Sequence, residues 1–283
     1  AVPVGGGLSL RILMLSHGYP PTISGVTLVV QRIAREMVRR GHHVTVVTAS
    51  DRGAPYHDYD HGVALWRVRS TPNPFWSEGR LPVLGADRLK EIVAEVRPDV
   101  INTHDGALLS WQLYRLERER SRIPEILTCH YFPRFVTYYV HVGEIAERVV
   151  ENITWELTTR VINSFDHVIF PTQTQRQAFV REGLKRESTV ISNGLDTARY
   201  RPRDGPEGDI EARYALPPGP RILCVGRLAK DKKIDVLIRA MRQVRSSHQA
   251  HLLLVGRGDE RRRLEDLRDS LGLRDCVHFL GFV

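Results

Sequence analysis

Three short loops carry glycines that could admit an anionic ligand to the backbone. Gly25 ends a loop that starts at Ser16 and opens a helical pattern, whereas Gly226 and Gly256 each follow an apolar run directly. A glycine at a helix start leaves room for a ligand to reach free backbone N–H groups, and a helix N-terminus favours anions. The three loops are therefore candidate phosphate-binding loops, against the simpler reading that these are ordinary turn glycines.

The second loop also contains two cations in a useful arrangement. Arg227 follows Gly226, and Lys232 stands where the next helical pattern begins. Two cations beside a helix N-terminus can grip a pyrophosphate through charge-assisted hydrogen bonds. A basic loop that simply faces solvent is the alternative.

Histidines stand where two apolar runs end. His104 and Asp105 follow the run 99–103, and His130 follows the run 126–129. If both runs are strands of one parallel sheet, these side chains lie at its carboxyl edge, where such sheets bind ligands. A structural role for a single strand-end histidine remains the alternative.

The order of these segments predicts an α/β fold. Short β-branched runs alternate with helical patterns, as in parallel βαβ units. In the amino-terminal part we expect strands at 11–15, 44–49, 63–68, 99–103, 126–129, 167–170 and 189–192, with helices at 26–40, 88–96, 108–120, 143–164 and 173–182.

A change of composition divides the chain. Residues 200–220 are rich in proline, glycine and charge and predict a linker between a domain at 1–199 and a second one at 221–283. In the second domain we expect strands at 221–225, 250–255 and 276–280 and helices at 232–244 and 260–271. Because this series stops after three strands, the second domain is predicted to be truncated.

Composition and missing motifs exclude several classes of protein. The 283 residues are 42% apolar and 26% charged, which excludes a disordered or collagenous chain. No GxGxxG after a strand, no GxxxxGK[ST] and no HExxH occurs, so neither a dehydrogenase nor a P-loop ATPase is expected. The net charge of +8 favours anionic partners, but no basic–aromatic pattern typical of nucleic-acid binding accompanies it.

The cysteines and the apolar runs indicate where in the cell the protein is located. Cys129, Cys224 and Cys276 are far apart and each lies in an apolar run, which predicts buried thiols rather than a disulfide or a zinc site. No signal peptide and no run long enough to span a bilayer is recognised. We therefore expect a cytoplasmic location.

Taken together, the motifs resemble those of the retaining glycosyltransferases of family 4, which have the GT-B fold. The similar segments span nearly all of residues 10–283 in the family's order, and the opening Tyr-Pro pattern is nearest the branch that glucosylates diacylglycerol. They are Tyr19–Val26 with Arg40–Val44, Ile191–Asp196, Val225–Leu228 with Lys232, Leu254–Gly258 and Val277–Gly281.

The resemblance implies two Rossmann-like domains and transfer of a hexose from a nucleotide-diphosphate sugar to a lipid or saccharide acceptor. Carried over by position, Arg227 and Lys232 hold the donor pyrophosphate, and His130 lies beside the transferred sugar as the candidate catalytic residue. Gly25, Gly226 and Gly256 would line the donor. The family uses front-face attack, with the charge on the leaving diphosphate stabilised by the two cations.

A metal-independent reaction without a further cofactor is also implied. An acidic triplet occurs at Asp58-Tyr59-Asp60, but it is placed in a loop far from the two cations. One departure from the family is clear: its Glu-x7-Glu motif lies beyond Gly281, whereas this chain ends at Val283. We therefore expect weak nucleotide binding by the chain as it stands.

The acceptor side is less defined. Aromatic residues and arginine stand side by side from His130 to His141, including Tyr131 and Arg134, which suits an anionic membrane surface. An aromatic wall of a saccharide cleft, or ordinary core, is the alternative. His104 and Asp105 are expected on this side too. A binding-only module and a sugar-nucleotide epimerase remain open as other functions, and a peripheral location at the inner membrane face would follow from a lipid acceptor.

Overall fold

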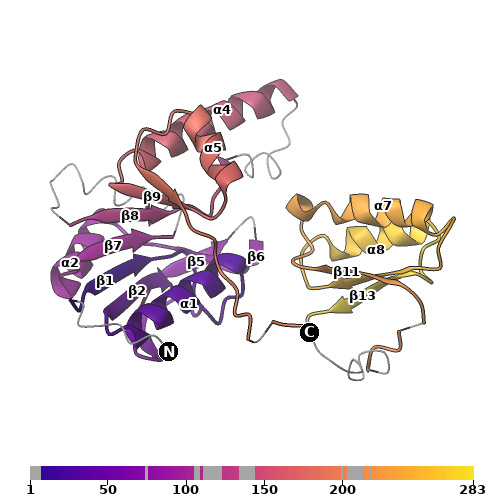
Figure 1. Cartoon of the computed structure of the whole chain (residues 1–283), viewed down its shortest axis with the longest axis horizontal. Coiled ribbons are helices and arrows are strands. Elements are labelled where there is room, and N and C mark those ends of the chain that lie inside the picture. The colour runs from indigo at the N-terminus through magenta and orange to yellow at the C-terminus, as the bar shows by residue number, and fades with distance from the viewer. Residues whose placement is uncertain are drawn as a thin grey trace. The chain divides into compact units, whose positions relative to one another are not determined.

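The computed structural model describes residues 8–73, 76–104, 109–110, 123–133, 144–198, 200–202, 213–216 and 218–283. The chain divides into two compact units, Ala1–Gly194 and Leu195–Val283. Figure 1 shows the two units in indigo to salmon and in orange to yellow. Both are built from mainly parallel strands and helices, so the predicted α/β class is confirmed.

An eight-stranded sheet forms the first unit, in the order β10-β9-β8-β7-β1-β2-β4-β3. Every neighbouring pair is parallel except β3 with β4. The strands are β1 (Arg11–Leu15), β2 (His43–Ala49), β3 (Tyr56–Asp60), β4 (Val63–Val68), β7 (Val100–Thr103), β8 (Glu125–Thr128), β9 (His167–Phe170) and β10 (Ser188–Val190).

Helices cover both faces of this sheet because the side chains of its strands alternate. Ile12 and Met14 of β1 pack with α1 (Gly25–Arg39), whereas Leu13 and Leu15 belong to the core on the opposite face. That second core includes residues from α2 (Ala86–Val96), α4 (Glu144–Ile162) and α5 (Gln173–Arg181). Figure 1 shows α4 and α5 on the side of the sheet opposite α1.

The strand order reverses at β1. From β1 the chain builds outward through β2 and β4 on one side, and through β7, β8, β9 and β10 on the other. In open α/β sheets, ligands bind beyond the carboxyl ends of the strands at such a switch point. A ligand site is therefore expected beyond the carboxyl ends of β1, β7 and β8.

Three strands differ from the expectations. The triplet Asp58-Tyr59-Asp60 was expected in a loop, but it lies in β3, a polar edge strand held by antiparallel pairing to β4. A hairpin of β5 (Ser70–Asn73) and β6 (Trp76–Pro82) was not expected at all. Both cases reflect the same cause: polar strands at an edge lack the apolar alternation that reveals half-buried strands.

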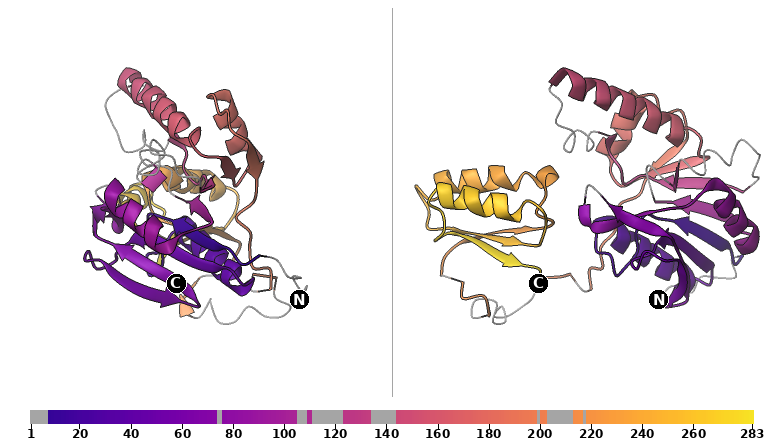
Figure 2. Two further views of the ribbon diagram at one scale, coloured as in Figure 1. Left: turned by 90° about the vertical axis from the view of Figure 1, so that its left-hand side faces the viewer. Right: turned by 180° about the vertical axis from the view of Figure 1, so that it is seen from behind.

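The second unit contains a three-stranded parallel sheet in the order β11 (Arg221–Val225), β12 (His251–Val255), β13 (Val277–Gly281). Helices α7 (Ile234–Val244) and α8 (Arg261–Ser270) both pack on one face, as Figure 2 shows. On the other face the edge strand β11 is open, with Leu223 62% and Val225 69% exposed.

The helix expected at 232–244 is interrupted. Lys230–Lys232 form a 3-10 turn, and Lys233 adopts a left-handed conformation with φ of 51° before α7 begins at Ile234. Cys129 and Cys276 are buried, Cys224 is half-buried, and all three are free thiols. Within the described residues, no helix combines the length and the apolar character needed to cross a membrane.

Candidate functional site

Histidines gather at the switch point of the first sheet. His104 follows β7 and is 1% exposed, and its Nδ1 lies 3.1 Å from Nε2 of His130, which follows β8. The ring planes are 15° apart and the centroids 5.4 Å apart, so the two rings meet edge to edge through these nitrogens. His17, two residues after β1, is close enough to both to act on their charge.

Burial keeps these histidines uncharged. It lowers the pKa of His104 to about 3 and, together with the nearby His17, lowers the pKa of His130 to about 4. Burial penalises the charged form of an imidazole, and neighbouring imidazoles add to that penalty. At neutral pH the pair therefore acts through hydrogen bonds and not through charge.

The backbone on both sides of His130 is anchored. Gln175, in the first turn of α5, donates its side-chain amide to the carbonyl of Cys129 at 3.2 Å and to that of Tyr131 at 2.9 Å. Burial raises the pKa of Tyr131 to about 12, so its phenol stays protonated. His130 is thus fixed through its ring by His104 and through its flanking peptides by Gln175.

The loop of the first glycine ends as the sequence predicts, at the start of a helix. Gly25 is the first residue of α1, and Ser24 caps the helix: its Oγ accepts from Thr27 N, and Thr27 Oγ1 accepts from Ser24 N at 2.8 Å. A Cβ on Gly25 would meet nothing within 4 Å. Space for a ligand is therefore present above this glycine.

Arg67 of β4 contacts the loop between β1 and α1. Its side chain is only 3% exposed, its Nη2 donates to the carbonyl of Pro20 at 2.6 Å, and its Nη1 lies 3.8 Å from the Asp51 carboxylate. Tyr56 also hydrogen-bonds that carboxylate. A buried arginine thus connects the body of the sheet to the loop between β1 and α1.

In the second unit the two predicted cations meet at one carboxylate. Arg227 Nη2 lies 3.3 Å from Asp231 Oδ1, and Lys232 Nζ lies 3.3 Å from Asp231 Oδ2. The Asp231 side chain is 9% exposed, whereas Lys232 is half exposed. The carboxylate therefore positions both cations just before α7, whose N-terminus has no side-chain cap.

Gly226 and Gly256 have different surroundings. A Cβ on Gly226 would meet nothing within 4 Å, whereas a Cβ on Gly256 would lie 1.9 Å from the Gly226 carbonyl oxygen. Gly256 also has a φ of 140°. The loops after β11 and β12 are further joined by the bond from Leu228 N to the Arg257 carbonyl, at 2.8 Å. Gly256 is therefore required for loop packing, and Gly226 leaves open space.

The sequence missed three residues of these sites. His17 follows β1 as His104 follows β7, so the same strand-end rule would have found it. Asp231 stands next to Lys232, but nothing in its type shows which charges it joins. Gln175 gives no signal, because its contacts depend on tertiary structure. Asp105 and Arg134, both expected on the acceptor side, lie outside the described residues.

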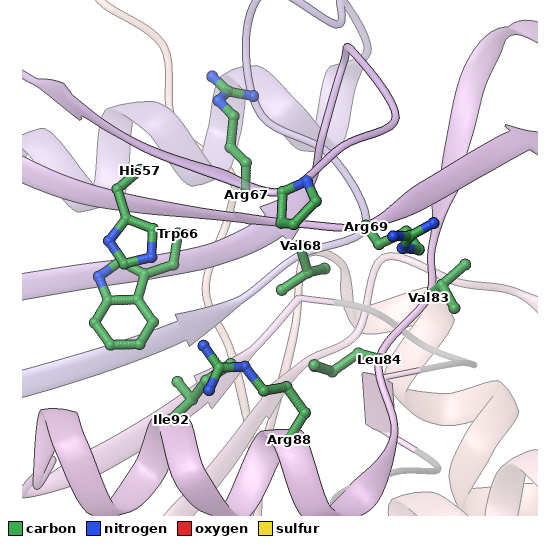
Figure 3. A pocket seen from close by; sticks show the side chains of 10 residues that line it. His57, Trp66, Arg67, Val68, Arg69, Val83, Leu84, Arg88 and Ile92 are labelled. Atoms are coloured by element: carbon green, nitrogen blue, oxygen red, sulfur yellow. The ribbon is translucent and has the colours of Figure 1, made fainter.

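A pocket of about 160 Å³ lies beside β4 in the first unit. Figure 3 shows Trp66 stacked on His57 at one end, with Arg88 of α2 nearby and Arg69 further along. Apolar side chains form much of the remaining wall, namely Pro55, Val68, Val83, Leu84 and Ile92. Such a lining suits a molecule with an apolar part and an anionic group.

Two family models match the chain. The model described as Glycosyltransferase Family 4 matches residues 23–199, and the model described as Glycosyl transferases group 1 matches residues 209–283.

Curated relatives show the same likeness. The chain is 29% identical to an uncharacterized glycosyltransferase of Methanocaldococcus jannaschii over 97% of this chain and 70% of the relative. It is 24% identical to the alpha-monoglucosyldiacylglycerol synthase of Streptococcus pneumoniae over 97% of this chain and 62% of that protein. The chain thus spans 62 to 70% of the length of these two relatives.

Solved structures share the fold. Sucrose-phosphate synthase from Thermosynechococcus elongatus superposes with a TM-score of 0.74 at 24% identity, covering 96% of this chain and 70% of that one. Anabaena HepE in complex with UDP and glucose superposes with a TM-score of 0.68 at 21% identity, covering 97% of this chain and 70% of that one.

Proposed function

The chain belongs to glycosyltransferase family 4, and on this premise we propose that it takes part in the retaining transfer of a hexose from a nucleotide-diphosphate sugar. The predicted family and enzyme class are confirmed by the family models and the named relatives. The donor, the stereochemistry, the lack of a metal requirement and the acceptor are all part of this proposal.

The pairing of Arg227 and Lys232 at Asp231 carries the donor proposal. Asp231 holds both cations beside the uncapped N-terminus of α7. Arg227 has five N–H donors and Lys232 three, so each can hold Asp231 and still donate to a diphosphate. The same two charges can stabilise the leaving diphosphate, and this supports a metal-independent reaction. HepE, a fold neighbour, is described in complex with UDP and glucose.

Thermal shift with UDP, GDP and ADP tests the donor site. A ligand that binds the folded state raises its stability by RT ln(1 + [L]/Kd), so millimolar nucleotide reveals even a weak site. We expect one nucleotide to raise the Tm, and R227A and K232A each to reduce its affinity about tenfold or more. The measurement should cover this chain and the protein extended by whatever its gene encodes after Val283.

Arg262→Ala is the matched control, because Arg262 is exposed on α8 and has no ion pair within the described residues. A nucleotide shift that R262A keeps and R227A loses supports the proposal. If no nucleotide stabilises either form of the protein, the donor site is not at Arg227 and Lys232.

For the acceptor we propose a lipid with an anionic headgroup. The pocket beside β4 combines an apolar wall with Arg69 and Arg88, which fits an amphiphilic anion. Two of the relatives are named for glycolipid synthesis: the S. pneumoniae synthase and a phosphatidylinositol monomannoside mannosyltransferase of Mycobacterium tuberculosis, 24% identical to this chain. A saccharide acceptor is the competing proposal, and the fold neighbour named sucrose-phosphate synthase favours it.

Vesicle co-sedimentation separates these two acceptors. We expect the protein to bind vesicles with anionic lipid at low salt, to release them at high salt, and to bind neutral vesicles much less. The double variant R69A/R88A should reduce binding severalfold, whereas R262A should not. No binding to anionic vesicles at low salt would contradict the lipid proposal and favour the saccharide.

Product analysis distinguishes the two remaining functions from transfer. An epimerase converts the donor alone, whereas a transferase releases its nucleotide in proportion to glycosylated acceptor. A binding-only module is stabilised by nucleotide, but even the extended protein then forms neither an epimerised donor nor a glycosylated acceptor.

A further inference from the structure

The contact between His104 and His130 restricts where their protons can sit. Nδ1 of His104 and Nε2 of His130 are 3.1 Å apart, so one of them must carry a hydrogen and the other must accept it. Both imidazoles are uncharged at neutral pH because they are buried. Two arrangements are therefore open, and each fixes the tautomers of both rings.

The far side of His104 distinguishes the two arrangements. Its Nε2 is fully buried and has no hydrogen-bond partner among the described residues. A proton on Nε2 would leave a buried N–H without an acceptor, and orphaned buried donors are rarer than under-satisfied acceptors. The proton of His104 therefore belongs on Nδ1, from which it is donated to His130 Nε2.

We propose that His104 is a positioning residue that locks His130 as the Nδ1–H tautomer, with that N–H offered to an oxygen of the bound ligand. With Nε2 occupied as an acceptor, Nδ1 is the remaining polar atom of the His130 ring, and it makes no hydrogen bond within the described part of the chain. His130 then serves as a neutral hydrogen-bond donor and not as a general base. This inference rests on the proposed function only in making that ligand the sugar donor or its acceptor.

Nitrogen-15 NMR of the histidine rings tests the tautomer in the chain itself, without any ligand. In the wild type we expect His130 to carry its proton on Nδ1 and His104 likewise. His104→Asn places an amide donor where Nδ1 lies and should keep the His130 tautomer. His104→Phe removes the donor and should turn His130 into a mixture of tautomers. A wild-type His130 protonated on Nε2 would overturn the proposal.

Folding and specificity need separate controls. The Tm of each variant shows whether the first unit still folds. If H104F does not fold, the comparison of H104N with the wild type is the test. His248→Asn is the matched control, since His248 is exposed on the second unit and should leave the His130 signals unchanged.

Kinetics of the extended protein tests the consequence for the ligand. We expect H104F to lower kcat/KM about tenfold to a hundredfold, with H104N close to wild type. A wild-type kcat/KM in H104F would overturn the positioning role even if the tautomers are as expected. An enzyme that fails to bind nucleotide in thermal shift would instead contradict the proposed function, while the NMR result on the two rings stands.

Discussion

At the scale of single residues, the three predicted ligand glycines separate into two kinds. Gly25 and Gly226 have open space where a Cβ would go, whereas a Cβ on Gly256 would collide with the Gly226 carbonyl. An alanine substitution should therefore affect ligand binding at a glycine with open space, and folding stability at a glycine in tight packing.

We expect G226A to leave the unfolding free energy of the second unit nearly unchanged and to weaken nucleotide binding. G256A should instead destabilise that unit by about 2 kcal/mol or more, because both its φ and its contact are unfavourable for a side chain. Urea unfolding of the two variants with and without nucleotide makes the comparison. A stable G256A protein would contradict the packing role.

The residue types were predictable from sequence, but their surroundings were not. His104 and His130 were found because both follow apolar runs, yet the contact between their rings depends on the order of β7 and β8 in the sheet. Asp231 was visible only as one charge in a basic loop, and its contacts with both cations appear only in three dimensions.

At the scale of elements, the loop between β1 and α1 depends on Arg67. The guanidinium is buried and donates to the Pro20 carbonyl, while Asp51 and the Tyr56 ring lie beside it. Tyr19 in the same loop is buried and donates to Asp60 at 2.7 Å. Two side chains from the β3–β4 region thus hold a loop that the sequence suggested for ligand binding.

Arg67→Met keeps most of the volume and removes the hydrogen bond to Pro20. We expect a loss of about 1–3 kcal/mol in unfolding free energy, because the partly buried Pro20 carbonyl loses its donor. Hydrogen exchange of residues 18–24 should speed up, while that of β1 stays slow. Arg69→Met is the control, since Arg69 is exposed two residues later. Equal exchange in R67M and R69M would show that Arg67 does not hold the loop.

Strands and helices with a strong apolar period were predicted well. β1, β4, β9 and β11 have the expected bounds. The helix expected at 232–244 was wrong at its start, because Lys233 takes a left-handed backbone that a pattern of apolar residues does not reveal. Polar edge strands such as β3 were missed because their partners, and not their own side chains, stabilise them.

At the scale of the whole molecule, stability should fall in acid through two separate sets of groups. Between pH 6.5 and about 4, His104 and His130 become protonated in the unfolded chain but stay neutral in the folded protein. The reason is that folding lowers their pKa values to about 3 and 4. The unfolding free energy therefore decreases as the pH falls, by up to about 1.4 kcal/mol per pH unit for each histidine. Asp60, whose pKa is lowered by Arg35, His61 and Tyr19 despite burial, adds a loss only below about pH 4.

Urea unfolding of the wild type and H104F at pH 7, 6 and 5 checks this. H104F should show a smaller decrease over that range, because one buried imidazole is gone. The lowered pKa of His278 in the second unit is common to both proteins and cancels in the comparison. Identical slopes would mean that His104 takes up a proton in the folded state as readily as in the unfolded one.

The α/β class of both units followed from the alternation of strands and helices. The topology did not follow, because the reversal of strand order at β1 depends on which strands pair across long sequence distances. The open face of β11, with Leu223 and Val225 exposed, was also invisible in a pattern that reads as an ordinary buried strand.

The loop between β11 and α7 also has a practical chemical consequence. The chain has 41 lysines and arginines, yet lysines occur only at positions 90, 185, 230, 232 and 233. Three of the five primary amines of the side chains thus lie in the one loop that contains Lys232. Acylation with an amine-selective reagent, followed by peptide mass spectrometry, would consequently report mainly on that loop, with Lys90 and Lys185 as internal references, and would map its occupancy in the unmutated protein.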